Sequence, residues 1–162
     1  LIAAPQLGDW GRVSADQTVA LTEYFIEHYN IDESMVYANG YSGGGETLSL
    51  VMDRRPGLFA AILHVSSVWD GDISNVAESR TPVCFVIGEE DEYYGSESIS
   101  GTYRRLVSLY EEQGLSSEEI ASLAVLDVKD QAYFDAAGAP NQHGGGGFVA
   151  YDSAIMGWLF GH

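Results

Sequence analysis

The sequence predicts an α/β fold in which helices flank a mostly parallel sheet. Short apolar runs alternate with segments of helical periodicity, which is typical of crossover connections between parallel strands. One serine lies in a G-x-S-x-G pattern between such a run and a helix-compatible stretch. The 162 residues are 46% hydrophobic, so they can bury one substantial core. We therefore expect a single domain over residues 1–162.

Apolar runs rich in β-forming residues mark the expected strands. Four such runs are expected to form strands, and they cover residues 1–5, 35–41, 59–65 and 83–87. A fifth run, residues 123–128, fits either a short strand or the tail of the helix before it.

Helices are expected where apolar residues recur at helical spacing beside end signals. The segment 14–17 resembles a capping box, and Leu21, Phe25 and Tyr29 then share one helical face. A second helix should run from the serine motif to residues 54–55, where Pro56 ends it. Further helices are expected around residues 103–110, after a second capping box at 116–119, and around 155–159.

The charge balance narrows the possible partners. Seven Lys and Arg against 24 Asp and Glu give a net charge of −17, which repels nucleic acid and anionic membrane surfaces. We therefore expect neither as a partner, and interpret the acidity mainly as a solvated surface. The one cysteine, Cys84, lies inside an apolar run and is expected to be a buried, inert thiol. We expect no metal and no cofactor, since the sequence has no metal-ligand cluster, phosphate loop or dinucleotide fingerprint.

The serine motif is the strongest chemical signal. Gly40 and Gly44 lie two residues before and two after Ser42, as a nucleophile elbow requires when the backbone must approach its neighbours closely. Serine is a weak nucleophile near neutral pH, so Ser42 needs a base, and the base needs an orienting acid.

His143 is the best candidate for the base, because it lies in a glycine-rich loop that can approach a serine. The other histidines, His28, His64 and His162, lie in a helix, an apolar run and the last position. Asp91 is the expected acid, because it follows the fourth strand in a G-x-x-D turn and lies between serine and histidine in chain order. The neighbouring carboxylates at 89, 90 and 92 are interpreted as solvated.

These three elements, in this order and spacing, resemble the α/β-hydrolase superfamily, and specifically bacterial carboxylesterases related to polyhydroxybutyrate depolymerases and feruloyl or acetylxylan esterases. The resemblance rests on residues 36–45, 88–91 and 143–160. It implies Ser42 as nucleophile, His143 as general base and acid, and Asp91 as the orienting carboxylate. It also implies the Gly43 amide as one oxyanion-hole donor.

Two aromatic residues are expected to contact the substrate. Trp69 follows the third strand and is a candidate wall of the acyl pocket, although packing on its loop is an equal alternative. Tyr41 precedes the nucleophile and is the second candidate. The loop 5–10 is expected to line the mouth of the cleft.

The sequence departs from the family at its start. Ahead of the strand that enters the elbow at Ser42 there is room for only one strand and one helix, whereas the family usually places about four strands there. The fold is therefore expected to lack the N-terminal strands, as the C-terminal part of a longer protein, a fragment in a complex, or a reduced hydrolase. A partner segment or subunit would supply the missing strands, and no second oxyanion donor is apparent.

The resemblance implies a serine hydrolase that cleaves a small-molecule or polymer-linked carboxylic ester through an acyl-enzyme. Two alternatives stay open: a serine peptidase of the prolyl oligopeptidase type and a non-catalytic binding module with a hydrolase-like fold. The usual substrates of the family weakly favour a secreted protein over a cytoplasmic one.

Overall fold

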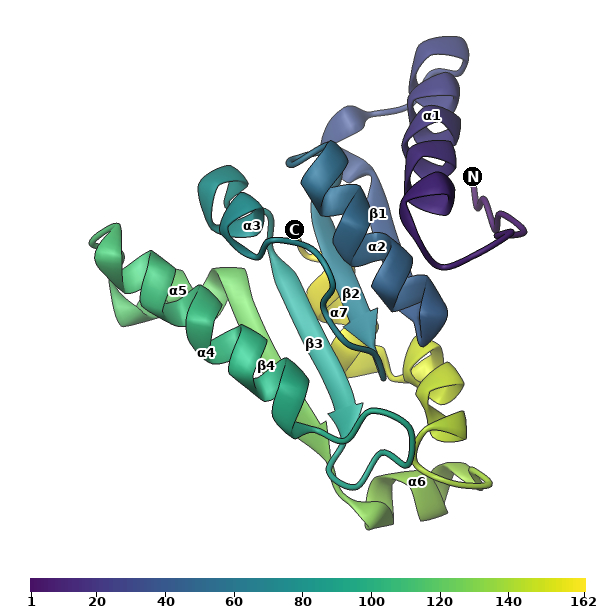
Figure 1. Ribbon diagram of the computed structural model, residues 1–162, viewed down its shortest axis with the longest axis vertical. Coiled ribbons are helices and arrows are strands. Elements are labelled where there is room, and N and C mark those ends of the chain that lie inside the picture. Colours follow the sequence, from purple (N-terminus) through teal and green to yellow (C-terminus); the bar gives the residue numbers. More distant parts are fainter.

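A computed structural model describes residues 1–162 and contains a parallel sheet with the strand order β1-β2-β3-β4 (Figure 1). Each strand pairs in parallel with the next, with Gly40 beside His64 and Leu63 beside Cys84. The strands are β1 (Tyr37–Tyr41), β2 (Ala61–Val65), β3 (Val83–Gly88) and β4 (Ala124–Lys129). The predicted parallel α/β architecture is confirmed.

Helices cover both faces of the sheet. In Figure 1, α2 and α4 lie in front of the strands and α7 lies behind them. The α-helices are α1 (Arg12–His28), α2 (Gly43–Arg54), α3 (Ser74–Ser79), α4 (Glu97–Glu112), α5 (Ser117–Leu123), α6 (Gln131–Ala137) and α7 (Ser153–Phe160). Two 3-10 helices, η1 (Glu33–Met35) and η2 (Gly144–Tyr151), complete the set.

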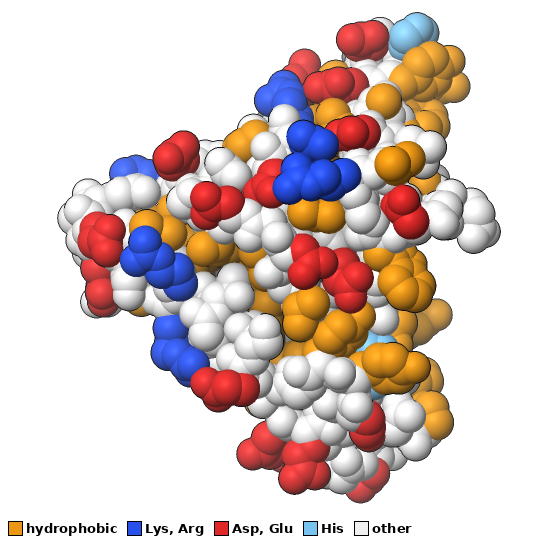
Figure 2. Space-filling view, in the orientation of Figure 1, with side chains coloured by type: hydrophobic (Ala, Val, Ile, Leu, Met, Phe, Trp, Pro, Cys, Tyr) orange, Lys and Arg blue, Asp and Glu red, His pale blue; other side chains and the backbone are white.

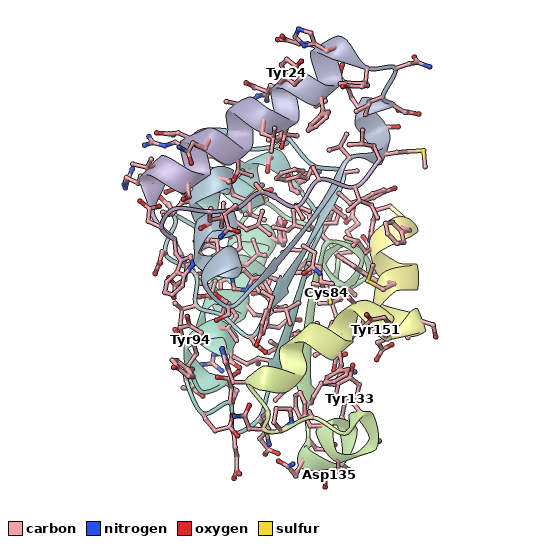
Figure 3. All side chains as sticks on the ribbon, turned by 90° about the vertical axis from the view of Figure 1, so that its right-hand side faces the viewer. Tyr24, Cys84, Tyr94, Tyr133, Asp135 and Tyr151 are labelled. Carbon is pink, nitrogen blue, oxygen red and sulfur yellow. The ribbon has the colours of Figure 1, made fainter.

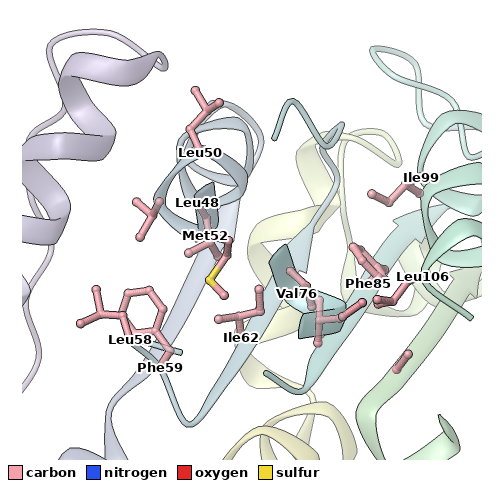
Figure 4. Close-up of a cluster of buried hydrophobic side chains, with 14 of the residues drawn as sticks. Leu48, Leu50, Met52, Leu58, Phe59, Ile62, Val76, Phe85, Ile99 and Leu106 are labelled. Carbon is pink, nitrogen blue, oxygen red and sulfur yellow. The ribbon is translucent and has the colours of Figure 1, made fainter. Parts of the chain in front are cut away.

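Alternate residues of the central strands belong to two hydrophobic cores. Ile62 and Phe85 lie in the larger core, where residues of α2 and α4 pack on the sheet (Figure 4). Leu63 and Val86 belong to the smaller core, which includes Leu159 of α7. Every residue of β2 and β3 is buried, which explains their continuous apolar sequences.

The strand expected at residues 1–5 is wrong. This segment is irregular and makes no backbone hydrogen bond to the sheet, and Leu1 and Ile2 are 80% and 96% exposed. A strand needs a paired neighbour to satisfy its backbone groups. β1 pairs only with β2, and residues 1–5 do not pair with its free edge, so this segment is not a strand.

The first helix begins earlier than expected. α1 starts at Arg12, and Ser14 is buried in its first turn rather than capping it. Asp9 performs the capping role, because its Oδ1 accepts the N–H groups of Gly11 and Ser14 at 3.0 and 3.3 Å. The second capping box is confirmed: Ser116 and Glu119 hydrogen-bond reciprocally at the start of α5.

The remaining strand predictions hold within a few residues, and the ambiguous run at 123–128 is the strand β4. The short helices α3 and α6 were not anticipated. No helix has both the length and the apolar composition needed to cross a membrane.

An apolar groove of about 1030 Å³ lies beside β1. The N-terminal segment, α1, β1 and α7 all contribute to its walls, and 20 of the 28 lining residues are hydrophobic. Figure 3 faces this side of the molecule, and Figure 2 shows hydrophobic side chains along the corresponding right-hand edge.

Candidate active site

Ser42 lies on a strained turn between β1 and α2. Its φ of 53° and ψ of −128° place a non-glycine residue in a region that L-residues rarely adopt. The Ser42 N–H donates to the carbonyl of Val65 at 3.0 Å, and the Ser67 hydroxyl donates to the Ser42 carbonyl at 2.7 Å. These bonds to β2 and the loop after it fix the turn, so the elbow expected from the sequence is present.

The glycine requirement differs from the one expected. A Cβ on Gly40 would lie 2.6 Å from the carbonyl oxygen of Gly44, so Gly40 is needed. A Cβ on Gly44 would meet nothing within 4 Å, whereas one on Gly45 would lie 2.5 Å from the Cβ of Ser67. The expectation that Gly44 carries the second steric role is wrong, because the close approach to the β2 loop falls one residue later.

The three expected triad side chains come together. Ser42 Oγ lies 3.1 Å from His143 Nε2, and His143 Nδ1 lies 3.0 Å from Oδ2 and 3.1 Å from Oδ1 of Asp91. The side chain of Asp91 is fully buried and that of His143 is 12% exposed. The three residues thus form a continuous hydrogen-bonded chain across 101 positions of sequence.

Backbone groups of the loop after β3 hold the Asp91 carboxylate. Its Oδ1 accepts the N–H groups of Tyr93 at 3.0 Å and Tyr94 at 2.9 Å. These bonds fix the orientation of the carboxylate. Asp91 is therefore directed towards His143 by its own turn.

Three tyrosine rings surround His143. The ring centroids of Tyr93, Tyr94 and Tyr41 lie 4.7, 5.5 and 5.6 Å from that of the imidazole. The Tyr41 hydroxyl donates to the carbonyl of His143 at 2.9 Å. Burial, aided by the Asp91 carboxylate, raises the pKa of Tyr41, so it stays a neutral donor. Tyr41 thus supports the segment that carries His143, and its expected contact with a substrate stays a prediction.

The Tyr94 hydroxyl is held by a carboxylate of α2. It donates to Glu46 Oε1 at 2.6 Å, and burial, together with Glu46, raises the pKa of Tyr94 to about 12. Tyr94 lies on the loop after β3 (Figure 3). This contact joins the acid-bearing loop to the helix that follows the nucleophile.

Gly43, the expected oxyanion donor, is the first residue of α2, where a backbone N–H has no partner within the helix. The Trp10 ring packs on it so closely that a Cβ on Gly43 would lie 2.5 Å from Trp10 Cε2. Trp10 is nevertheless 61% exposed. The end of the loop 5–10 therefore lies beside the nucleophile, although sequence reasoning did not single out Trp10.

Trp69 packs against the larger core. Its ring lies 5.3 Å from His64 and 5.8 Å from Phe85, centroid to centroid, and its Nε1 is buried without a hydrogen-bond partner. The structure therefore gives Trp69 a packing role, and contact with a substrate stays a prediction.

None of the groups expected to be inert makes a hydrogen bond to a triad side chain. Cys84 is buried in the interior (Figure 3), and burial raises the pKa of its thiol to about 12. His64 is fully buried, while His28 lies on the exposed surface of α1. No group of three His, Cys, Asp or Glu side chains is arranged to hold a metal ion.

Glu92, which was expected to be a solvated carboxylate, takes part in the site. Its carboxylate accepts the backbone N–H of His143 at 2.9 Å. Gln142, which the sequence analysis did not single out, is only 2% exposed. Its one sequence signal was its position directly before the candidate base.

The fold and the elbow define an α/β-hydrolase, and comparison with known proteins agrees. The family model of the prolyl oligopeptidase family matches residues 6–111. The chain belongs to this family. The predicted superfamily is therefore confirmed, through a family that the sequence analysis held as the peptidase alternative.

A solved structure described as a thermostable esterase has the same fold. The two superpose with a TM-score of 0.70 at 20% sequence identity, over 90% of this chain and 35% of the esterase chain. The present chain thus spans about a third of that structure's length. No curated protein matches.

Proposed function

We propose that this chain carries the catalytic centre of a serine hydrolase that cleaves carboxylic esters through an acyl-enzyme. The observation that carries the proposal is the hydrogen-bonded chain of Ser42, His143 and Asp91, with links of 3.1 and 3.0 Å. It is supported by the strained φ of Ser42, which is typical of a nucleophile elbow.

The geometry suits two-step acyl transfer. With its Nδ1 proton directed to Asp91, His143 presents a free Nε2 lone pair to the Ser42 hydroxyl. Ser42 Oγ bonds to the ester carbonyl carbon while its proton passes to Nε2, and His143 then protonates the departing alcohol. Water, deprotonated by the same nitrogen, releases the acid and restores Ser42. The Gly43 N–H would donate to the oxyanion.

The family match favours a peptidase as the second candidate, and the structural likeness to an esterase favours the first. Both reactions use the same triad, so leaving groups must separate them. We prefer ester cleavage because expelling an alcohol from an ester needs less transition-state stabilisation than expelling an amine from an amide. Gly43 is the one donor evident for the oxyanion, so the stabilisation that this site can supply is small.

The test compares p-nitrophenyl butyrate with a glycyl-prolyl p-nitroanilide, using the wild type, Ser42→Ala and His143→Ala. Ester turnover that both substitutions abolish, with a much slower anilide reaction, supports the proposal. Faster anilide cleavage would establish the peptidase instead. Folded wild-type protein that turns over neither substrate would leave the binding module as the surviving alternative.

We also propose that a β-strand from outside residues 1–162 pairs with the free edge of β1. The edge is unpaired, and an apolar groove of about 1030 Å³ runs beside it. Much of the related esterase chain has no counterpart here. A strand with apolar side chains facing the groove would satisfy the edge and cover that surface.

A further inference from the structure

The loop that carries His143 is fastened to the acid turn by a second carboxylate, Glu92. Oε1 of Glu92 accepts the N–H of Gln142 at 3.1 Å, and Oε2 accepts the N–H of His143 at 2.9 Å. One side chain thus binds two successive backbone amides, the second belonging to the catalytic base. Such bonds to an ionised acceptor are stronger than neutral ones.

Gln142 makes the reciprocal contact. Its Oε1 accepts the N–H of Glu90 at 2.8 Å, and its Nε2 donates to Gln131 Oε1 at 3.0 Å. The Gln142 side chain also fills the space where a Cβ of Gly88 would lie. The glycine of the G-x-x-D turn is therefore needed to admit this side chain.

On its N-terminal side, His143 is reached by an irregular segment, because the short helix α6 ends at Ala137. On its C-terminal side, His143 directly precedes the 3-10 helix η2, whose first four residues are glycines. Apart from the bond to Glu92, the backbone of His143 makes one hydrogen bond to a residue distant in sequence. In that bond the Tyr41 hydroxyl donates to the His143 carbonyl. The N–H of His143 also holds the pKa of Glu92 below its usual range, so this acceptor stays charged at neutral pH.

We propose that Glu92 and Gln142 form a clasp that positions His143 against Asp91 and Ser42. They are positioning residues, because neither side chain contacts the reacting atoms. The clasp rests on the proposed function, since it serves the catalytic base. Loosening it should displace the imidazole and slow the chemical step, while leaving the substrate cleft unchanged.

The test measures kcat and KM for p-nitrophenyl butyrate in Glu92→Ala, Glu92→Gln and the wild type. Misplacement of a catalytic group by about 1 Å can cost on the order of 100-fold, so we expect kcat of Glu92→Ala to fall by about 10- to 100-fold with KM within about twofold. The kcat of Glu92→Gln should lie between those of the wild type and Glu92→Ala, because the single amide oxygen can replace only one of the two carboxylate oxygens that accept backbone N–H groups.

Glu89→Gln is the matched control, since it removes the same charge from an exposed neighbour whose side chain makes no hydrogen bond. Its kcat should stay within about twofold of the wild type. Labelling with a fluorophosphonate provides a second readout: a displaced base slows labelling yet leaves one site per chain, whereas misfolding lowers the number of sites.

An unchanged kcat in Glu92→Ala, or a loss equal to that of Glu89→Gln, would overturn the clasp. So would a fall in activity that matches the fall in labelled sites in both Glu92 variants. An inactive, unlabelled wild type would instead refute the proposed function.

Discussion

At the scale of single residues, two buried titratable groups, Asp91 and His64, differ in whether a charge on them would have hydrogen-bond partners. Asp91 is buried but receives two backbone N–H groups and the imidazole, so its charge is compensated. His64 is buried among Trp69 and Phe85, and neither of its ring nitrogens has a hydrogen-bond partner. A charge on Asp91 therefore has partners, whereas a charge on His64 would be buried without one and would lower the stability of the fold.

Replacing Asp91 by Asn should preserve the turn but impair the base. The amide oxygen can still accept the N–H groups of Tyr93 and Tyr94, whereas the amide cannot stabilise an imidazolium on His143. We expect kcat for p-nitrophenyl butyrate to fall by about 10³- to 10⁴-fold with little change in unfolding temperature. A loss below about tenfold would show that Asp91 does not orient the base.

His64 should make stability depend on pH. Burial lowers the pKa of His64 from 6.5 to about 4, so the unfolded chain binds a proton more readily than the folded one between these values. Its contribution is therefore fully present above pH 6.5 and is lost as pH falls towards 4, by about 3 kcal/mol in total.

Urea unfolding of the wild type and His64→Leu at pH 7.5, 6 and 5 measures this dependence. The wild type should lose more stability than the variant as the pH falls from 7.5 to 5. Parallel curves for the two proteins would show that His64 is not the titrating group.

At the scale of elements, the elbow depends on how closely α2 approaches its neighbours. Gly40 faces the backbone of α2, and Gly45 faces Ser67 after β2. Gly44 faces open space, although it is the glycine named by the motif.

Gly45→Ala and Gly44→Ala form a matched pair that tests this packing. The first should destabilise the fold by about 1–3 kcal/mol, because the new methyl group overlaps Ser67. The second should be neutral or stabilising by up to about 1 kcal/mol, because alanine favours a helix over glycine. Chemical unfolding of both variants measures the difference, and equal losses would contradict the assignment.

Elements whose signal is local could be predicted from the sequence. The elbow, the capping box at Ser116 and the fully buried strands follow from residues that lie close together in the chain. The segment 1–5 misled because its apolar composition suits a strand, whereas a strand also requires a partner that no local pattern reveals. The role of Asp9 as the cap of α1 was hidden by the nearer Ser14.

In the candidate site too, the residues with a local sequence signal could be predicted and those defined by a distant contact could not. Ser42, Asp91 and His143 could be located because each has a distinct local context and a known order in the chain. The clasp could not, because Glu92 is one of four adjacent acidic residues and only the three-dimensional contact with residues 142–143 distinguishes it. Trp10 likewise gains its meaning from a contact with Gly43.

At the scale of the whole molecule, two surface properties oppose each other. The net charge of −17 favours separation of the chains, and Figure 2 shows acidic side chains spread over the visible face. The unpaired edge of β1 and the apolar groove beside it favour association. Salt screens the first property and leaves the second intact.

The isolated chain should therefore self-associate more strongly at 0.5 M than at 0.05 M salt. Asn39→Lys, on the exposed edge of β1, should reduce that association, because a charge on a strand edge discourages pairing. Ser98→Lys, exposed on α4, is the control for the added charge. Sedimentation velocity measures the association of all three proteins. A wild type that stays monomeric at both salt concentrations would contradict the expectation that the free edge of β1 and the groove drive association.

The central claim is that residues 42, 91 and 143 form a working catalytic centre. Its most direct test is fluorophosphonate labelling followed by intact mass measurement of the wild type, Ser42→Ala and His143→Ala. We predict one adduct per wild-type chain, located on Ser42, with none on Ser42→Ala and little on His143→Ala in the same time. A folded wild type that takes up no label, or label that persists in Ser42→Ala, would contradict the claim.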